Sequence, residues 1–193
     1  MVDDGSDEIE AAKNRETCRR FGAEYLFLPG SRGLPCALNA GLSYFLADPA
    51  IDWIGAMQDD VQLSPEALKA LKAVRHIRER PILTPYYAKE HMVHGRARIE
   101  DYDVLFQRSA PGLMLYAHRD YWRDVLPIPT PHLGAPKGRG KRPGQGADED
   151  WWITAWSPRS APKRGLYITC IPDLAEHLAE EPALSTWRKF DLQ

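Results

Sequence analysis

The pattern of apolar and polar residues along the chain predicts strands and helices that follow one another. Several short apolar runs, bounded by proline, glycine or acidic residues, have the length and composition of β-strands. They lie at residues 24–30, 52–58, 81–87, 112–118 and 165–172. The run at 52–58 is continuously apolar, which is typical of a strand in the middle of a sheet. We therefore expect this strand to be buried on both faces.

Helical spacing of apolar residues appears between these runs. Ser6 or Asp7 can cap a helix that continues to about Phe21, where a glycine follows. Residues 33–47 place several large apolar side chains on one helical face. These are Leu34, Leu38, Leu42, Phe45 and Leu46. The sequence thus predicts one helix that ends near Phe21 and a second helix over residues 33–47.

A further helix has the clearest start signal in the chain. Ser64 is placed as its N-cap, Pro65 at the first helical position and Glu66 in the first turn. The polar stretch 88–110 fits no single element. Because strands alternate with helices, we expect an α/β fold with a largely parallel sheet, built as one domain over residues 1–193.

Composition and charge narrow the class of protein. The 193 residues are 44% hydrophobic and carry a formal net charge of -2, so bulk charge does not favour a polyanion partner. Three widely spaced cysteines form neither a disulfide framework nor a CxxC metal site, which favours a reducing compartment. No apolar run approaches the roughly 18 residues that span a bilayer, and no signal peptide pattern opens the chain. We expect a cytoplasmic protein without a transmembrane segment.

Two pairs of aspartates stand where strands are expected to end. Asp59 and Asp60 follow the run at 52–58, and Asp3 and Asp4 belong to a VDDGS stretch typical of a strand that enters a ligand-binding loop. Ligands of parallel sheets bind beyond the carboxyl ends of the strands. Mg²⁺ and Mn²⁺ take one or two carboxylates together with substrate phosphates. The pairs therefore suggest a metal-diphosphate site, with a solvated turn as the alternative at Asp59 and Asp60.

The second half contains a basic loop. Residues 127–147 include five prolines and five glycines, which exclude a helix or a central strand. Its basic side chains are Lys137, Arg139, Lys141 and Arg142. We interpret the segment as a mobile active-site loop or a disordered connector. Such a loop can close over a diphosphate, contact a nucleic-acid backbone or stay solvated.

An acidic cluster follows the basic loop directly. Asp148, Glu149 and Asp150 precede Trp151 and Trp152. A carboxylate near a cation and an indole ring is suited to act as a general base, and the same residues can also favour a helix N-terminus. The order of two aspartate pairs, a basic loop and this cluster is the layout expected for transfer from a nucleotide-diphosphate donor.

In that order, five stretches resemble the family 2 glycosyltransferases, which have the GT-A fold. They are VDDGSDE at 2–8, SRGLPCALNAGL at 31–42, WIGAMQDDVQLSPEAL at 53–68, APGLMLYAHRDYW at 110–122 and GADEDWW at 146–152. The resemblance covers most of the chain. It implies a mostly parallel, Rossmann-related sheet flanked by helices. Residues 1–63 would form the nucleotide- and metal-binding half, and 64–193 the acceptor-binding half with a flexible loop at 127–147.

The resemblance also implies roles at the donor site. Asp3 and Asp4, with Gly5, would contact the nucleoside, and Arg32 would contact the diphosphate. Asp60 would bind the metal that bridges the diphosphate, Mn²⁺ or Mg²⁺, with Asp59 beside it. The tail segment EHLAEEPALSTW is similar to a His-containing segment of some relatives, which makes His177 a further metal or phosphate contact.

Catalysis is implied for the acidic cluster. Asp150 would deprotonate the acceptor hydroxyl for in-line displacement at the anomeric carbon, and Glu149 or Asp148 would orient it or contact the acceptor. The family's first strand, the following helix and nearly all of the second strand are absent. The uncovered sheet edge that this loss leaves invites pairing in a homo-oligomer. Gln58 also replaces the usual first aspartate of the metal motif.

We therefore expect an inverting, metal-dependent glycosyltransferase. It would move a sugar from a nucleotide sugar, most simply a UDP-sugar, to a hydroxyl of a saccharide or lipid-linked acceptor. Two alternatives stay open. The acceptor is a hydroxylated base in DNA, contacted by the basic loop, or the protein is a catalytically inactive GT-A-like module for binding or assembly.

Overall fold

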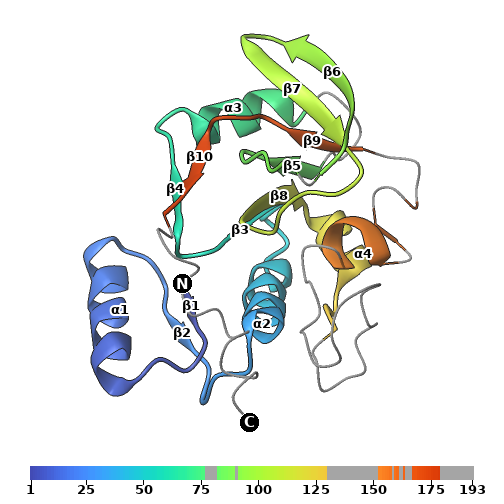
Figure 1. Cartoon of the computed structure of the whole chain (residues 1–193). Coiled ribbons are helices and arrows are strands. Elements are labelled where there is room, and N and C mark those ends of the chain that lie inside the picture. The colour runs from blue at the N-terminus through green and yellow to red at the C-terminus, as the bar shows by residue number, and fades with distance from the viewer. Residues whose placement is uncertain are drawn as a thin grey trace.

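The chain forms an α/β structure in which a six-stranded mixed sheet is flanked by helices (Figure 1). This computed structural model describes residues 1–76, 82–89, 91–129, 152–157, 159–160, 163 and 167–178. The expectation of an α/β fold is confirmed. The division at residue 63 into two functional halves stays a prediction.

The first unit consists of β1 (Val2–Asp3), α1 (Glu8–Arg20) and β2 (Leu26–Phe27). Asp7 caps α1 by accepting hydrogen bonds from two backbone N–H groups of the first turn, at 3.0 Å each, which decides between the two expected caps. β1 and β2 pair in parallel and form a sheet of their own. The crossover through α1 is what makes this parallel pairing available.

The next unit consists of α2 (Leu34–Ala47) and β3 (Trp53–Met57). Leu42 is buried and belongs to the main core, as the helical spacing predicted, whereas Phe45 is 44% exposed. β3 lies at the end of the six-stranded sheet and pairs with one strand, β8 (Met114–His118). The expectation that this strand is buried on both faces is wrong, because Gly55 and Met57 on one face are exposed while Ile54 on the other is buried.

The remaining strands and helices follow closely along the chain. They are β4 (Val61–Leu63), α3 (Ala67–Val74), β5 (Ile82–Thr84), β6 (Val93–Ile99), β7 (Tyr102–Gln107), α4 (Arg119–Val125), the π-helix η2 (Trp152–Trp156), β9 (Ile168–Cys170) and β10 (Ala175–His177). The unassigned stretch 88–110 contains the hairpin β6–β7. α3 begins two residues later than expected, because Pro65 and Glu66 form a turn before it.

The six-stranded sheet is mostly antiparallel. Its order is β3-β8-β5-β9-β7-β6, and among these strands β5 and β9 are the parallel pair. The expectation of a mostly parallel sheet is wrong. After α3, four strands follow one another with no helical crossover between them, and short connections produce antiparallel neighbours. β4 and β10 form a separate antiparallel pair.

The sheet separates two apolar clusters. Along β8, Leu115 faces the cluster that includes α2 and α4, while Met114 faces the cluster that includes α3. This alternation follows from the two-residue period of a strand. Trp122 of α4 is fully buried and donates its indole N–H to the Ile54 carbonyl of β3 at 3.0 Å. The core thus fixes β3, whose carboxyl end carries two of the expected site residues.

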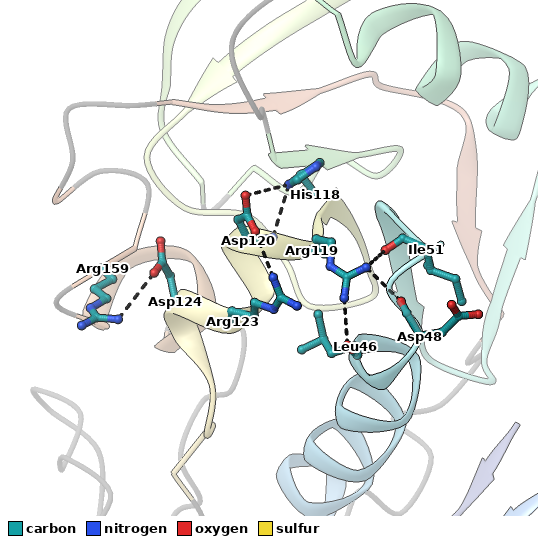
Figure 2. Close-up of polar contacts among 9 residues, drawn as sticks. All are labelled: Leu46, Asp48, Ile51, His118, Arg119, Asp120, Arg123, Asp124 and Arg159. Carbon is teal, nitrogen blue, oxygen red and sulfur yellow. Dashed lines mark hydrogen bonds and ion pairs between the residues drawn. The ribbon is translucent and has the colours of Figure 1, made fainter.

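Arg119 ties α4 to the end of α2 (Figure 2). Its guanidinium donates through Nη1 to the carbonyls of Asp48 and Ile51, at 2.9 and 2.8 Å, and through Nη2 to that of Leu46, at 2.9 Å. Carbonyls at a helix C-terminus lack intrahelical donors and carry partial negative charge. The buried Arg119 satisfies them and holds α2 against the sheet.

Candidate functional site

The connections between the first three strands reverse direction at β1. The chain passes through α1 from β1 to β2, and then returns through α2, whose Gly41 lies against Val2 of β1, before it enters β3. In a single open α/β sheet such a reversal marks a crevice beyond the carboxyl ends of the strands, whereas here β1 and β3 belong to separate sheets. Asp4 follows β1, and Asp59 and Asp60 follow β3. The expected acidic pairs therefore lie at the carboxyl ends of two strands that α2 contacts.

Asp60 and His177 meet although 117 positions separate them in the chain. β4 and β10 pair with His177 opposite Val61, and the Leu178 N–H donates to the Asp60 carbonyl at 2.8 Å. This pairing brings His177 Nε2 to 3.0 Å from Asp60 Oδ2, and both side chains are about one-third exposed. Two of the three residues expected at the metal site, Asp60 and His177, are thus brought together, and Asp59 is adjacent in the chain.

The chemistry of this pair fits a divalent cation. Asp60 Oδ1 is buried and has no hydrogen-bond partner among the described residues, which leaves one oxygen of the carboxylate unsatisfied. A carboxylate oxygen and a neutral imidazole nitrogen are common ligands of Mn²⁺. No group of three or more such side chains occurs within the described ranges. A cation at this pair would need further ligands beyond these two side chains.

Asp4 organises the loop that precedes α2. Its carboxylate accepts hydrogen bonds from the backbone N–H of Arg32 at 3.0 Å, from that of Gly33 at 2.6 Å, and from the Ser31 hydroxyl at 3.1 Å. The Arg32 guanidinium has no partner in the part of the chain that the structure describes. It stands directly before α2, whose N-terminus favours anions. The loop after β1 thus contacts the loop before α2. This contact contains three residues expected at the nucleotide site, Asp4, Gly5 and Arg32.

Gly5 makes this contact sterically feasible. Its φ is +78°, and a Cβ atom at this position would collide with the backbone of Gly30 and Ser31. Glycine is the residue that tolerates both the positive φ and the close approach. The two loops can therefore touch, which positions Asp4 for its bonds to the N-terminus of α2.

Asp3 faces the interior of the first unit. It is 4% exposed, and its carboxylate accepts from the Ser6 N–H at 2.9 Å, from Asn14 Nδ2 at 2.9 Å and from the Tyr25 hydroxyl at 2.8 Å. Burial raises the pKa of this carboxyl, but the hydrogen bonds from Asn14, Ser6 and Tyr25 outweigh it and lower the pKa to about 2. A charged Asp3 therefore holds β1, α1 and the segment before β2 together.

The partners of these carboxylates were not predicted from the sequence. The inward position of Asn14 could have been predicted from the sequence. Asn14 lies at helical spacing between the buried residues Ala11 and Cys18, on the inner face of α1. Tyr25 and Ser31 had no comparable signal. Each is placed by tertiary contacts with β1 and its loop.

The expected catalytic cluster, Asp148, Glu149 and Asp150, lies outside the described residues, as does most of the basic loop. The segment that follows is held firmly. Tyr121 donates its hydroxyl hydrogen bond to the Ile153 carbonyl at 2.5 Å, and Trp152 Nε1 donates to the Val125 carbonyl at 2.9 Å. α4 therefore anchors η2, two residues after Asp150.

Comparison with protein-family models and with curated protein sequences finds no match for this chain. No helix in the described part of the chain is long and apolar enough to cross a membrane. The site geometry and the fold therefore carry the functional argument.

Proposed function

We propose that the protein is an inverting, metal-dependent glycosyltransferase of the GT-A type that uses a nucleotide-sugar donor, with a UDP-sugar as the first to test. The observation that carries this proposal is the Asp60–His177 pair at the carboxyl end of β3, with Nε2 3.0 Å from Oδ2. The loop of Asp4 and Arg32 joins β1 to the start of α2, and α2 contacts both β1 and β3. A cation site together with a cationic loop suits a diphosphate.

Each donor-site residue has a distinct part in this proposal. Asp60 and His177 would hold Mn²⁺ or Mg²⁺ with the diphosphate, and Asp59 borders the site on the turn after β3. A bound divalent cation neutralises charge that develops on a departing diphosphate. Arg32 would add a hydrogen-bonding cation to the diphosphate. Asp4 keeps the Arg32 backbone in place. Gly5 lets the nucleoside-facing loop approach the backbone of Gly30 and Ser31.

The transfer step requires a base on the acceptor side, and Asp150 is the proposed one, with Glu149 or Asp148 orienting the acceptor. Asp150 takes the proton of an acceptor hydroxyl. The hydroxyl oxygen then forms a bond to the anomeric carbon as the bond from that carbon to the diphosphate oxygen breaks. The diphosphate leaves with the electron pair, and attack from the opposite face inverts the configuration. The acceptor is a saccharide or a lipid-linked hydroxyl.

The first test is thermal unfolding with UDP or GDP, each with and without Mn²⁺. A ligand that binds only the folded state at one hundred times its Kd adds about 2.7 kcal/mol of stability. We expect a rise in Tm with one nucleotide that requires the metal. If neither nucleotide raises Tm at any metal concentration, the donor-site proposal fails.

Single-residue variants test which side chains are required for the metal-dependent rise in Tm. Asp60→Asn and His177→Ala are expected to remove the metal-dependent rise in Tm. Asp52→Asn is the matched control, because Asp52 lies beside the opposite end of β3 and is exposed. Asp150→Asn is expected to keep the nucleotide-dependent rise and to lose sugar transfer. Normal transfer by Asp150→Asn would disprove its role as the base.

A second function has one observation in its favour. The strands β1 and β2 form a sheet separate from the six-stranded sheet, so the donor site spans two sheets that share no hydrogen bond among the described strands. This favours a GT-A-like module that binds or assembles without turnover. It predicts nucleotide binding with no sugar transfer or donor hydrolysis under any metal, which a radiolabelled donor assay measures directly.

A further inference from the structure

A cavity lies beside the hairpin β6–β7, which forms one end of the six-stranded sheet (Figure 1). Its volume is about 530 Å³, within the range of about 300–1,000 Å³ that is typical of small-molecule sites. The described residues that line it come from the hairpin, from the segment after β5 and from the segment after β9. None of these lining residues belongs to the candidate donor site or to the expected catalytic cluster. The cavity is therefore a separate feature of the molecule.

The cavity lies on the same side of the sheet as the candidate cation site. β3 is antiparallel to β8, β8 is antiparallel to β5, and β5 is parallel to β9. β3, β5 and β9 therefore run in one direction, and their carboxyl ends lie on one side of the sheet. Tyr87, which lines the cavity, stands three residues after β5, and Pro172 stands two residues after β9. Asp60 likewise stands three residues after β3.

A short segment connects the cavity to the cation site. Pro172 stands five residues before His177, so the Cα atoms of these two residues are at most about 18 Å apart. Between them, the Leu174 N–H donates to the Pro85 carbonyl at 3.3 Å, and the Leu174 carbonyl accepts from the Ser64 N–H at 2.9 Å. These bonds fix the segment to the ends of β5 and β4. The wall of the cavity at Pro172 is therefore held in place by backbone pairing.

One face of the hairpin supplies the polar groups of the cavity. Arg96 lies opposite Leu105 across the two strands, and Arg98 lies opposite Asp103. Residues that lie opposite each other, and residues two apart on one strand, project from the same face. Arg96, Asp103 and Leu105, which all line the cavity, therefore stand on one face. Arg96 and Asp103 are diagonal neighbours, so their backbones are about 7–8 Å apart.

The charged groups of this face leave one unpaired cation. The Arg98 guanidinium donates through Nη1 to Asp103 Oδ1 and through Nη2 to the Asp101 carbonyl, at 3.1 Å each, so the charge of Asp103 is balanced. The Arg96 guanidinium has no hydrogen-bond or ion-pair partner within the described ranges. A single guanidinium pairs with a carboxylate through two parallel hydrogen bonds. A phosphate dianion would bring a second negative charge close to Asp103, so Arg96 favours a carboxylate.

The other lining groups favour a ring that carries hydroxyls. Tyr87 is 40% exposed, and an exposed aromatic ring beside a cavity offers a face on which a ligand ring can pack. Asp103 Oδ2 accepts no hydrogen bond in the described part of the chain, so a ligand hydroxyl can donate to it. An apolar ring without hydroxyls would desolvate this carboxylate without replacing its hydrogen bonds to water, which is costly.

We propose that this cavity binds a sugar ring that carries a carboxylate, that is, a hexuronate. The carboxylate pairs with Arg96, a hydroxyl on the opposite side of the ring donates to Asp103, and the ring packs against Tyr87. The separation of Arg96 and Asp103 suits one ring with substituents at both ends. This binding does not depend on the proposed function. Combined with that function, it would make the acceptor an acidic saccharide, and this extension alone rests on the proposed sugar transfer.

Titration of the full chain with sodium glucuronate, followed by amide chemical shifts in NMR, tests the proposal. We expect saturable shifts at Tyr87, Arg96 and Leu105, the residues around the cavity. Glucose has the ring and the hydroxyls but no carboxylate, and we expect it to bind at least about fivefold more weakly. Benzoate and inorganic phosphate, which lack the hydroxylated ring, are also expected to bind more weakly than glucuronate.

Each other outcome of the titration overturns the proposal. No saturable shift at these residues, or equal affinity for glucose and glucuronate, would show that the cavity does not recognise a sugar acid. Tighter binding of benzoate would reassign the cavity to aromatic acids, and tighter binding of phosphate would reassign it to simple anions. The titration uses no nucleotide and no metal, so its failure is distinct from a failure of the proposed donor site.

Two arginine variants test the assigned contact. Arg96→Gln is expected to reduce the affinity for glucuronate to that for glucose and to leave the affinity for glucose unchanged. Arg108→Gln is the matched control, because Arg108 is also exposed, follows β7 directly and does not line the cavity. Both variants are expected to keep the native Tm, since neither guanidinium has a partner among the described residues. Unchanged glucuronate binding by Arg96→Gln, or an equal loss in both variants, overturns the proposal.

Discussion

The buried Asp3 carboxylate gives the first unit a stability that depends on pH. Three hydrogen bonds hold its pKa at about 2, against 3.8 for the free side chain. A group whose pKa is depressed by folding contributes stability above its unfolded pKa and loses it as the pH falls through its folded pKa. The three donors come from a loop, a helix and the segment before β2, so the charge links elements that share little apolar area.

Asp3→Asn is therefore expected to reduce the free energy of unfolding by about 2 kcal/mol at neutral pH. The difference from the native chain should shrink as the pH falls from about 4 to about 2, because the native carboxyl becomes protonated there. Urea unfolding at a series of pH values measures it. A difference that does not change with pH would mean that packing, not charge, explains the loss.

Gly5 and Gly22 form a natural comparison at the residue scale. Both have positive φ, +78° and +63°, but a Cβ atom on Gly22 meets nothing within 4 Å. Gly22→Ala is expected to cost about 1 kcal/mol, the price of the backbone conformation alone. Gly5→Ala adds a backbone collision and is expected to cost at least twice as much and to abolish nucleotide-dependent stabilisation. Equal losses for the two variants would contradict the close approach of the loops.

At the scale of elements, α2 depends on a cap supplied from a distant segment. Arg119→Met removes three charge-assisted hydrogen bonds, to the carbonyls of Leu46, Asp48 and Ile51, from a buried position. We expect a loss of about 3 kcal/mol in the free energy of unfolding. Arg123→Ala on the same helix is the control. Arg123 is exposed and contacts Asp120 at 3.4 Å, so its loss is expected to stay below about 1 kcal/mol.

Some helices could be predicted from the sequence, whereas the positions of the strands in the sheet could not. Local signals placed α1 and most of α2, because a cap and an apolar stripe act within a few residues. The position of β3 at an edge depends on pairing with β8, about sixty residues away in the chain. An apolar strand at an edge and one in the middle have the same sequence pattern when helices cover part of the edge strand. The antiparallel order was likewise set by the hairpin β6–β7, whose polar residues carry no strong strand signal.

At the scale of the whole molecule, stability is expected to be uneven. α1 buries Ala11 and Cys18 while Ile9 and Phe21 are exposed, and both residues of β2 are exposed. β5 is fully buried between β8 and β9. Regions with little buried apolar surface open at lower free energy than core strands.

Native-state hydrogen exchange should therefore show α1 opening well before β5 and β8. The amides of α1 should exchange through a local opening whose free energy depends weakly on denaturant. Identical opening free energies for α1 and β8 would show instead that the two sheets unfold as one cooperative unit.

The candidate site was predicted better than the sheet around it. Asp60 and His177 were proposed from a strand-end position and a family resemblance, and the structure brings them into contact. Asp4, Gly5 and Arg32 also lie together, because a VDDGS turn and the start of a helix have local signatures. Asp3 is placed inward, where its neighbours Asn14 and Tyr25 decide its environment. Such tertiary partners cannot be inferred from one residue's own segment.

The span of 117 positions between Asp60 and His177 has a consequence for the synthesis of the protein. A ribosome delivers β4 long before it delivers β10, so a nascent chain that extends past Asp60 but not to His177 has the carboxylate and lacks the imidazole. The cation binding proposed for this pair would therefore be confined to chains whose translation has passed His177. Products that terminate before His177 are expected to lack the proposed ion site, and so to have no means to compete for the cell's manganese or magnesium there.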